Sequence, residues 1–87
     1  MFRVLIVDDA PVMRQGMKHL IDWSNYGFQI AGTASDGQQA LELQRKNQYD
    51  VIITDLKMPH MDGIELIRNL AEDKQNCKVI IVSAYGE

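Results

Sequence analysis

The sequence predicts one small α/β domain built around an open parallel sheet. Four short apolar runs alternate with three segments whose apolar residues recur at helical spacing, and this alternation is typical of βαβ units. Most of the runs lack polar alternation, which indicates strands covered by helices on both faces. The length of 87 residues is that of a single domain.

Each expected strand is a run of β-branched or aliphatic residues. We expect strands at 3–8, 50–55 and 78–83, where the apolar residues are nearly continuous. Another strand is expected at 28–34, where the pattern alternates in part and includes Gly32. An internal glycine suits an edge strand better than a central one.

The first helix is expected at 11–22. Pro11 fits its first turn, where a missing amide donor costs nothing. We interpret Met13 and Met17 as core residues rather than part of a cofactor site. The full stripe at helical spacing is Val12, Met13, Gly16, Met17, Leu20 and Ile21.

Two further helices are expected at 36–47 and 62–73. Ser35 and Gln38 have the spacing of a capping box before the first of them. Asp62, with a glutamate three residues later, has the same spacing before the second.

Composition and charge exclude several functions. Nine Lys and Arg against twelve Asp and Glu give a net charge of -3, so we expect no nucleic-acid binding by this segment. No apolar run approaches the roughly 20 residues that cross a bilayer, and Asp8 comes too early for a signal peptide. We expect a cytoplasmic protein without a membrane partner. Cys77 is the single cysteine and permits no internal disulfide.

Acidic residues follow two of the expected strands. Asp8 and Asp9 end the first run and Asp55 ends the third, while Ser83 follows the fourth. Right-handed crossovers bring the carboxyl ends of parallel strands to one edge of the sheet, where ligands of open α/β sheets bind. Three carboxylates would repel one another there unless a cation relieved them, and their oxygens suit Mg²⁺ or Ca²⁺.

Each acidic residue also has a structural interpretation. Asp9 could cap the first helix, and Asp55 could accept hydrogen bonds from amides of the next turn. For any one aspartate alone the structural interpretation is favoured, whereas for all three together a divalent-metal site is favoured.

The junctions after the strands carry motifs that resemble one protein family. In this order and register along the whole chain, they resemble the receiver domain of bacterial response regulators. The resemblance implies a flavodoxin-like open parallel sheet of strand order 2-1-3-4, and a two-component signalling switch rather than a turnover enzyme. The motifs are Val7-Asp8-Asp9, Thr54-Asp55-Leu56-Lys57-Met58-Pro59, Met61-Asp62-Gly63 and Val82-Ser83-Ala84.

The resemblance also implies a role for each site residue. Asp55 matches the phosphoacceptor, whose carboxylate attacks phosphorus to form an acyl phosphate. Asp8 and Asp9 match the acidic pair that holds Mg²⁺ with Asp55, and Lys57 matches the position whose backbone carbonyl completes the metal shell. Ser83 matches the hydroxyl that hydrogen-bonds the phosphoryl group. The implied phosphate donor is a sensor histidine kinase.

Domains of this family continue past the fourth strand with a helix, a strand and a final helix, which the 87 residues do not contain. We therefore expect a truncated receiver domain over 1–87, with the strand at 78–83 on an exposed edge. Such an edge can pair with another copy, so we expect a homo-oligomer. The alternative function is a folding or assembly fragment that has lost signalling competence.

Two further comparisons bear on function. A third alternative, an aspartate-based phosphatase, fits the sequence poorly. Such enzymes carry a second aspartate two residues after the nucleophile, where this chain has Lys57. The pairs Asp22-Trp23 and Gly27-Phe28 are similar to receivers attached to AraC-type output domains, which implies a parent protein that regulates transcription. Trp23 fits equally well as a packing residue against the first helix.

Overall fold

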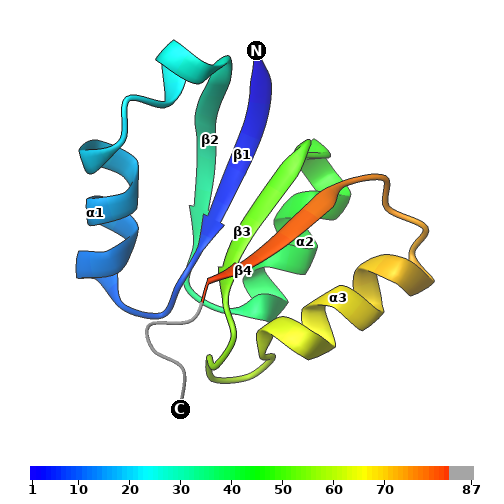
Figure 1. The fold of residues 1–87 in the computed structure, drawn as a ribbon. Coiled ribbons are helices and arrows are strands. Elements are labelled where there is room, and N and C mark those ends of the chain that lie inside the picture. The colour runs from blue at the N-terminus through cyan, green and yellow to red at the C-terminus, as the bar shows by residue number, and fades with distance from the viewer. Residues whose placement is uncertain (83–87) are drawn as a thin grey trace.

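The computed structural model describes residues 1–82, which form a four-stranded sheet flanked by helices (Figure 1). Ser83, expected to end the fourth strand and to contact the phosphoryl group, lies outside the described residues. The elements in chain order are β1 (Phe2–Val7), α1 (Pro11–Leu20), the 3-10 helix η1 (Trp23–Tyr26), β2 (Phe28–Ala34), α2 (Gly37–Asn47), β3 (Val51–Asp55), α3 (Gly63–Glu72) and β4 (Lys78–Val82).

The sheet has the order β2-β1-β3-β4, and all three neighbouring pairs are parallel. This confirms the predicted order 2-1-3-4, with β2 and β4 at the edges. Figure 1 shows α1 on one side of the sheet and α2 and α3 on the other. Within residues 1–82, no helix is long and apolar enough to cross a membrane.

The two faces of the sheet are buried to different extents. Leu5 and Ile52 point toward α2 and α3, where they pack against Leu66 of α3 in the larger core. The opposite face has a smaller core of three buried residues, Val4, Ile6 and Ile53. Alternate residues of β1 therefore serve different cores, as the period of a strand requires.

Helix α1 differs most from expectation, because none of its residues is buried. Val12 and Leu20 are 80% and 86% exposed, and Met13 is 46% exposed. Met17 is half-buried against the smaller core. The prediction that Met13 belongs to the core is therefore wrong, and that for Met17 holds in part. Within the described structure, Met17 is the apolar residue of α1 that packs against this core, so only a narrow side of the helix meets the sheet.

The helix caps explain where α2 and α3 begin. The cap of α2 is Asp36, not Ser35 as predicted, because the Asp36 side chain accepts a hydrogen bond from the Gln39 amide at 2.8 Å. The Gln39 side-chain oxygen in turn accepts from the Ser35 amide at 2.6 Å. At α3 the predicted capping box of Asp62 and its following glutamate is confirmed.

The segment leading into β2 contains η1, which the sequence pattern did not indicate. There Trp23 donates from Nε1 to the Met17 carbonyl at 2.8 Å. Its ring also meets Phe28 edge-on, with centroids 6.4 Å apart. The packing interpretation of Trp23 is therefore confirmed.

Gly32 is needed in β2, because a Cβ there would lie 2.5 Å from the Tyr49 hydroxyl.

Candidate functional site

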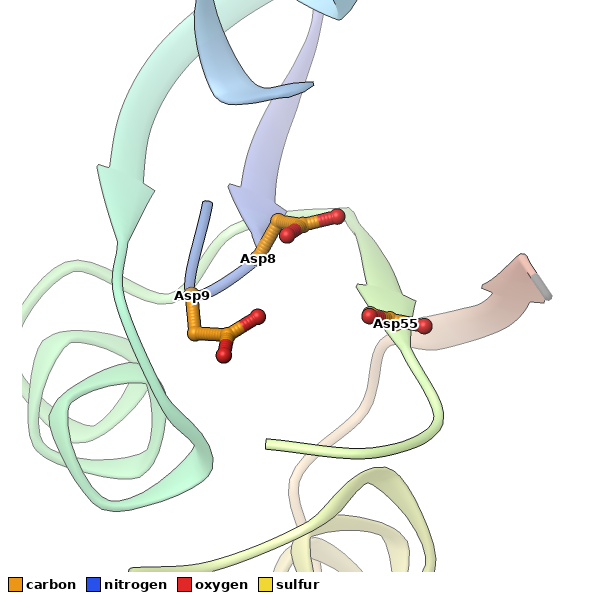
Figure 2. Close-up of side chains that lie close together, drawn as sticks. All are labelled: Asp8, Asp9 and Asp55. Atoms are coloured by element: carbon orange, nitrogen blue, oxygen red, sulfur yellow. The ribbon is translucent and has the colours of Figure 1, made fainter. Parts of the chain in front are cut away.

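The three predicted acidic residues meet at the carboxyl-terminal edge of the sheet (Figure 2). The register of β1 and β3 pairs Val7 with Thr54, so the residues that follow, Asp8 and Asp55, come from adjacent strand ends. Asp9 joins them from the loop after β1. One carboxylate oxygen from each aspartate lies within 4.8 Å of the other two.

Asp8 is held in place by hydrogen bonds from three directions. Its amide donates to the Ala34 carbonyl of β2 at 3.1 Å, and its side-chain Oδ1 accepts from the Ala10 amide at 2.9 Å. Its carbonyl oxygen accepts from the Arg14 guanidinium at 2.7 Å. With both backbone groups and Oδ1 bound, the direction of the second carboxylate oxygen is set by the fold.

Burial and repulsion act together on the Asp8 carboxyl. Asp8 is only 7% exposed, and burial raises its pKa above the ordinary value of 3.8, while the charges of Asp55 and Asp9 raise it further. The hydrogen bond from Ala10 opposes the rise in pKa. The folded chain thus holds Asp8 in an environment that disfavours its negative charge, which a bound cation would reverse.

The structural interpretations of Asp9 and of Asp55 have opposite outcomes. The residue that caps α1 is Ala10, and no side chain caps that helix, so the interpretation of Asp9 as a helix cap is wrong. Asp55 does accept a hydrogen bond from the next amide, since Leu56 donates to its Oδ1 at 2.8 Å. The hydroxyl of Thr54 donates to the Asp55 carbonyl at 3.0 Å, which adds a backbone restraint at the same residue.

Helix α3 begins against the backbone of Asp55. A Cβ on Gly63 would lie 2.7 Å from the Asp55 carbonyl oxygen, and the Gly63 amide donates to the Leu56 carbonyl at 2.8 Å. Glycine at this position therefore allows the start of α3 to lie close to the end of β3. The side chain of Lys57 is exposed.

A cavity of about 180 Å³ opens between the carboxylates and α1. Its polar wall includes Asp8, Asp9 and Asp55, and its apolar wall includes Met13, Met17, Ile53 and Val82. The carboxylates therefore border a space large enough for a small ionic group.

The donor set fits a hard divalent cation. Oxygen ligands placed about 2.1 Å from one Mg²⁺ lie at most about 4.2 Å apart, and the three oxygens already lie within 4.8 Å of one another. Small side-chain rotations would bring them into one coordination shell. Carboxylate oxygens with room for water are typical of Mg²⁺ sites.

Sequence reasoning missed Arg14, which binds the Asp8 carbonyl from the first turn of α1. The signal available was an arginine at a short helical distance from an acidic strand end. Arginine at such a position is more often a solvated surface residue, so the pattern by itself did not single it out.

Comparisons with known proteins all indicate the same family. Residues 4–87 match the response regulator receiver domain family. The transcriptional regulatory protein HptR of Staphylococcus aureus is 40% identical over 87 residues, which are 100% of this chain and 34% of HptR. This chain thus spans about a third of the length of that curated relative.

Solved structures agree with this family. The response regulator domain of Thermotoga maritima CheB is 38% identical with a TM-score of 0.87, over 100% of this chain and 63% of that one. A two component transcriptional regulator AraC from Clostridium phytofermentans is 36% identical with a TM-score of 0.83, over 99% of this chain and 67% of that one. With its fold, its acidic edge and these relatives, the chain belongs to the receiver domains of two-component response regulators.

Proposed function

We propose that this chain is a Mg²⁺-dependent phosphoacceptor that takes a phosphoryl group on Asp55 from a sensor histidine kinase. The observation that carries the proposal is the meeting of Asp55 with Asp8 and Asp9 at one sheet edge. The family match favours a signalling domain over a folding or assembly fragment.

In the proposed reaction a carboxylate oxygen of Asp55 attacks the phosphorus of the donor. The new oxygen–phosphorus bond forms as the bond to the donor's leaving group breaks, and the product is an acyl phosphate. Asp55 Oδ1 is held by the Leu56 amide, so the other oxygen is the one we assign as nucleophile. The hydrogen bond also fixes the carboxylate plane, which lowers the entropic cost of reaching the attack geometry.

Asp8, Asp9 and Asp55 would hold Mg²⁺, and we propose that the Lys57 carbonyl adds a fourth ligand. When bound, the cation neutralises negative charge on the carboxylates and the incoming phosphoryl oxygens. We propose that Ser83 donates a hydrogen bond to the phosphoryl group.

The phosphoacceptor proposal is tested with acetyl phosphate as a small-molecule donor. Intact-mass spectrometry should show one added phosphoryl group, dependent on Mg²⁺ and removed by hydroxylamine, which cleaves acyl phosphates. Asp55→Asn should abolish the addition, whereas Glu42→Gln, a matched change on the exposed face of α2, should not. Equal labelling of Asp55→Asn and the parent chain would overturn the proposal.

The metal site has a separate test. Mg²⁺ should raise the melting temperature of the parent chain, because it binds the folded state and relieves repulsion there. Asp9→Ala and Asp55→Asn should each reduce this gain. An unchanged Mg²⁺ effect in both variants would contradict a shared site.

We further propose that the domain acts in the cytoplasm, within a longer regulator of transcription. Two relatives support this: HptR is a transcriptional regulatory protein, and the Clostridium relative is a two component transcriptional regulator AraC. In a protein carrying this domain, DNA binding measured by gel shift should persist when residues 1–87 are deleted. Loss of binding to every DNA probe would contradict an output region separate from this domain.

A further inference from the structure

Arg14 makes a contact that the phosphoacceptor proposal does not use. It lies in the first turn of α1 and is half-buried, and its Nη1 donates to the carbonyl oxygen of Asp8 at 2.7 Å. The Arg14 amide also donates to the Ala10 carbonyl at 3.1 Å. The residue is thus bound to both ends of the short acidic loop between β1 and α1.

The Asp8 carbonyl belongs to the peptide that joins Asp8 to Asp9. Because a peptide is planar, restraining its oxygen also restrains the plane that contains both Cα atoms, and with it the backbone positions from which the two side chains leave. Asp8 has other restraints, from the Ala34 carbonyl and the Ala10 amide. Asp9 is exposed, so little packing restrains its side chain, and the orientation of this peptide contributes to where its carboxylate lies.

We propose that Arg14 is a positioning residue for the cation site: by holding the Asp8 carbonyl it orients the Asp8–Asp9 peptide and presents both carboxylates toward Asp55. This inference rests on the proposed Mg²⁺ site. It assigns to Arg14 a contribution to metal affinity that acts through the backbone rather than through its charge.

The sign of the effect separates the two roles. A positive guanidinium near a cation site repels Mg²⁺, so its removal would tighten Mg²⁺ binding if charge were its main contribution. If Arg14 acts by positioning, its removal weakens binding instead. Loss of a residue that orients metal ligands typically costs about 10- to 100-fold in metal affinity.

The experiment is a calorimetric titration of the chain with Mg²⁺ alone. We expect Arg14→Ala to weaken Mg²⁺ binding on the order of 10-fold. We expect Arg14→Lys to recover part of the loss, because an ammonium can donate to the same carbonyl but lacks the rigid fork of arginine. Lys18→Ala is the matched control, since it removes a positive charge from an exposed position of the same helix and should leave the affinity within about twofold.

Amide hydrogen exchange without metal gives a second readout. The Ala10 amide, which donates to Asp8 Oδ1, should exchange faster in Arg14→Ala and Arg14→Lys than in the parent, and at the parental rate in Lys18→Ala. Circular dichroism verifies that each variant folds. If Arg14→Ala does not fold, the Mg²⁺ titration and the hydrogen exchange of Arg14→Lys together test the proposal.

The outcomes separate this inference from the one on which it rests. Equal or tighter Mg²⁺ binding by the Arg14 variants, with normal binding by the parent, would overturn the positioning role alone. Unchanged exchange at Ala10 would overturn it as well. If the parent itself showed no saturable Mg²⁺ binding, both the metal site and the role of Arg14 would be wrong.

Discussion

Asp8 is the most buried of the three carboxylates, and its environment disfavours the charge that a metal ligand needs. Burial is the main cause of its raised pKa, with repulsion from Asp55 and Asp9 adding to it. Such an environment lowers the stability of the metal-free fold, and binding of a cation would restore that stability. At the scale of single residues, affinity for a ligand and stability of the empty protein therefore oppose each other.

The raised pKa of Asp8 predicts a pH-dependent effect of Asp8→Asn. Because the folded pKa exceeds the ordinary value of 3.8, the stability associated with the protonated carboxyl is fully present below that value. It is lost as the pH rises through the folded pKa. Asn keeps an oxygen acceptor for the Ala10 amide and removes the charge.

Without divalent ions, Asp8→Asn should therefore raise the free energy of unfolding at pH 7. The gain should be at least about 1 kcal/mol, because the relief of burial adds to a repulsion of about that size between two unit charges about 4 Å apart in water. It should vanish near pH 3. Urea unfolding at the two pH values measures this difference, and an equal gain at both would contradict the assignment.

Alanine substitutions at Gly63 and Gly16 should change the stability of the fold in opposite directions. At Gly63 the added Cβ would lie 2.7 Å from the Asp55 carbonyl oxygen, and a main-chain atom cannot move aside cheaply, so we expect a loss of about 1–3 kcal/mol. At Gly16 the nearest atom is a Leu20 methyl at 3.8 Å, so the better helix propensity of alanine should raise stability by up to about 1 kcal/mol. Urea midpoints test both, and equal midpoints for the two variants would refute the close approach at Asp55.

At the scale of elements, α3 and α1 are attached to the sheet in different ways. Leu66 and Leu70 of α3 are buried in the larger core, and the capping box fixes where this helix begins. Helix α1 has no buried residue, and one of its restraints is the Arg14 hydrogen bond to the end of β1. A helix whose apolar face lacks a partner has little tertiary packing to stabilise it.

This contrast predicts the cost of truncating one leucine in each helix. Leu66→Ala, at a fully buried position, should destabilise the fold by about 2–5 kcal/mol. Leu20→Ala, at a position that is 86% exposed, should change stability by no more than about 0.5 kcal/mol. Thermal unfolding by circular dichroism tests both, and similar losses would mean that α1 is packed as firmly as α3.

At the scale of the whole molecule, β4 is an edge strand that pairs with β3 alone among residues 1–82 (Figure 1). Ile80 is 50% exposed, Ile81 36% and Val82 42%. The strand therefore presents apolar side chains beside unpaired backbone groups, and natural edge strands usually carry charges or bulges that prevent pairing. Self-association through this edge stays a prediction.

The edge predicts a sedimentation coefficient that rises with protein concentration. Ile80→Lys should suppress the rise, because a charge on an edge strand opposes pairing between copies. Val12→Lys is the matched control, since it adds the same charge at an exposed apolar position of α1. A monomer at every concentration in a dilution series would refute self-association.

The motifs that resemble receiver domains predicted the order of the sheet, and the strand pattern alone predicted the meeting of the acidic residues. Apolar runs mark the strands, and parallel strands must end at one edge, so Asp8, Asp9 and Asp55 could be placed together without coordinates. The predicted capping box before α3 was also correct, because a cap depends on residues only three positions apart. These features depend on local or topological rules.

Tertiary structure alone decided how much of each helix is buried and which side chains contact the backbone beside the acidic residues. The stripe on α1 has the right spacing for a core, yet Val12 and Leu20 are exposed. Periodicity shows which residues share a face but not whether another element covers that face. The hydrogen bond from Arg14 to the Asp8 carbonyl could not be predicted either, because it depends on where a helix lies against a strand end. In the sequence, an arginine that makes this contact looks the same as one that lies in solvent.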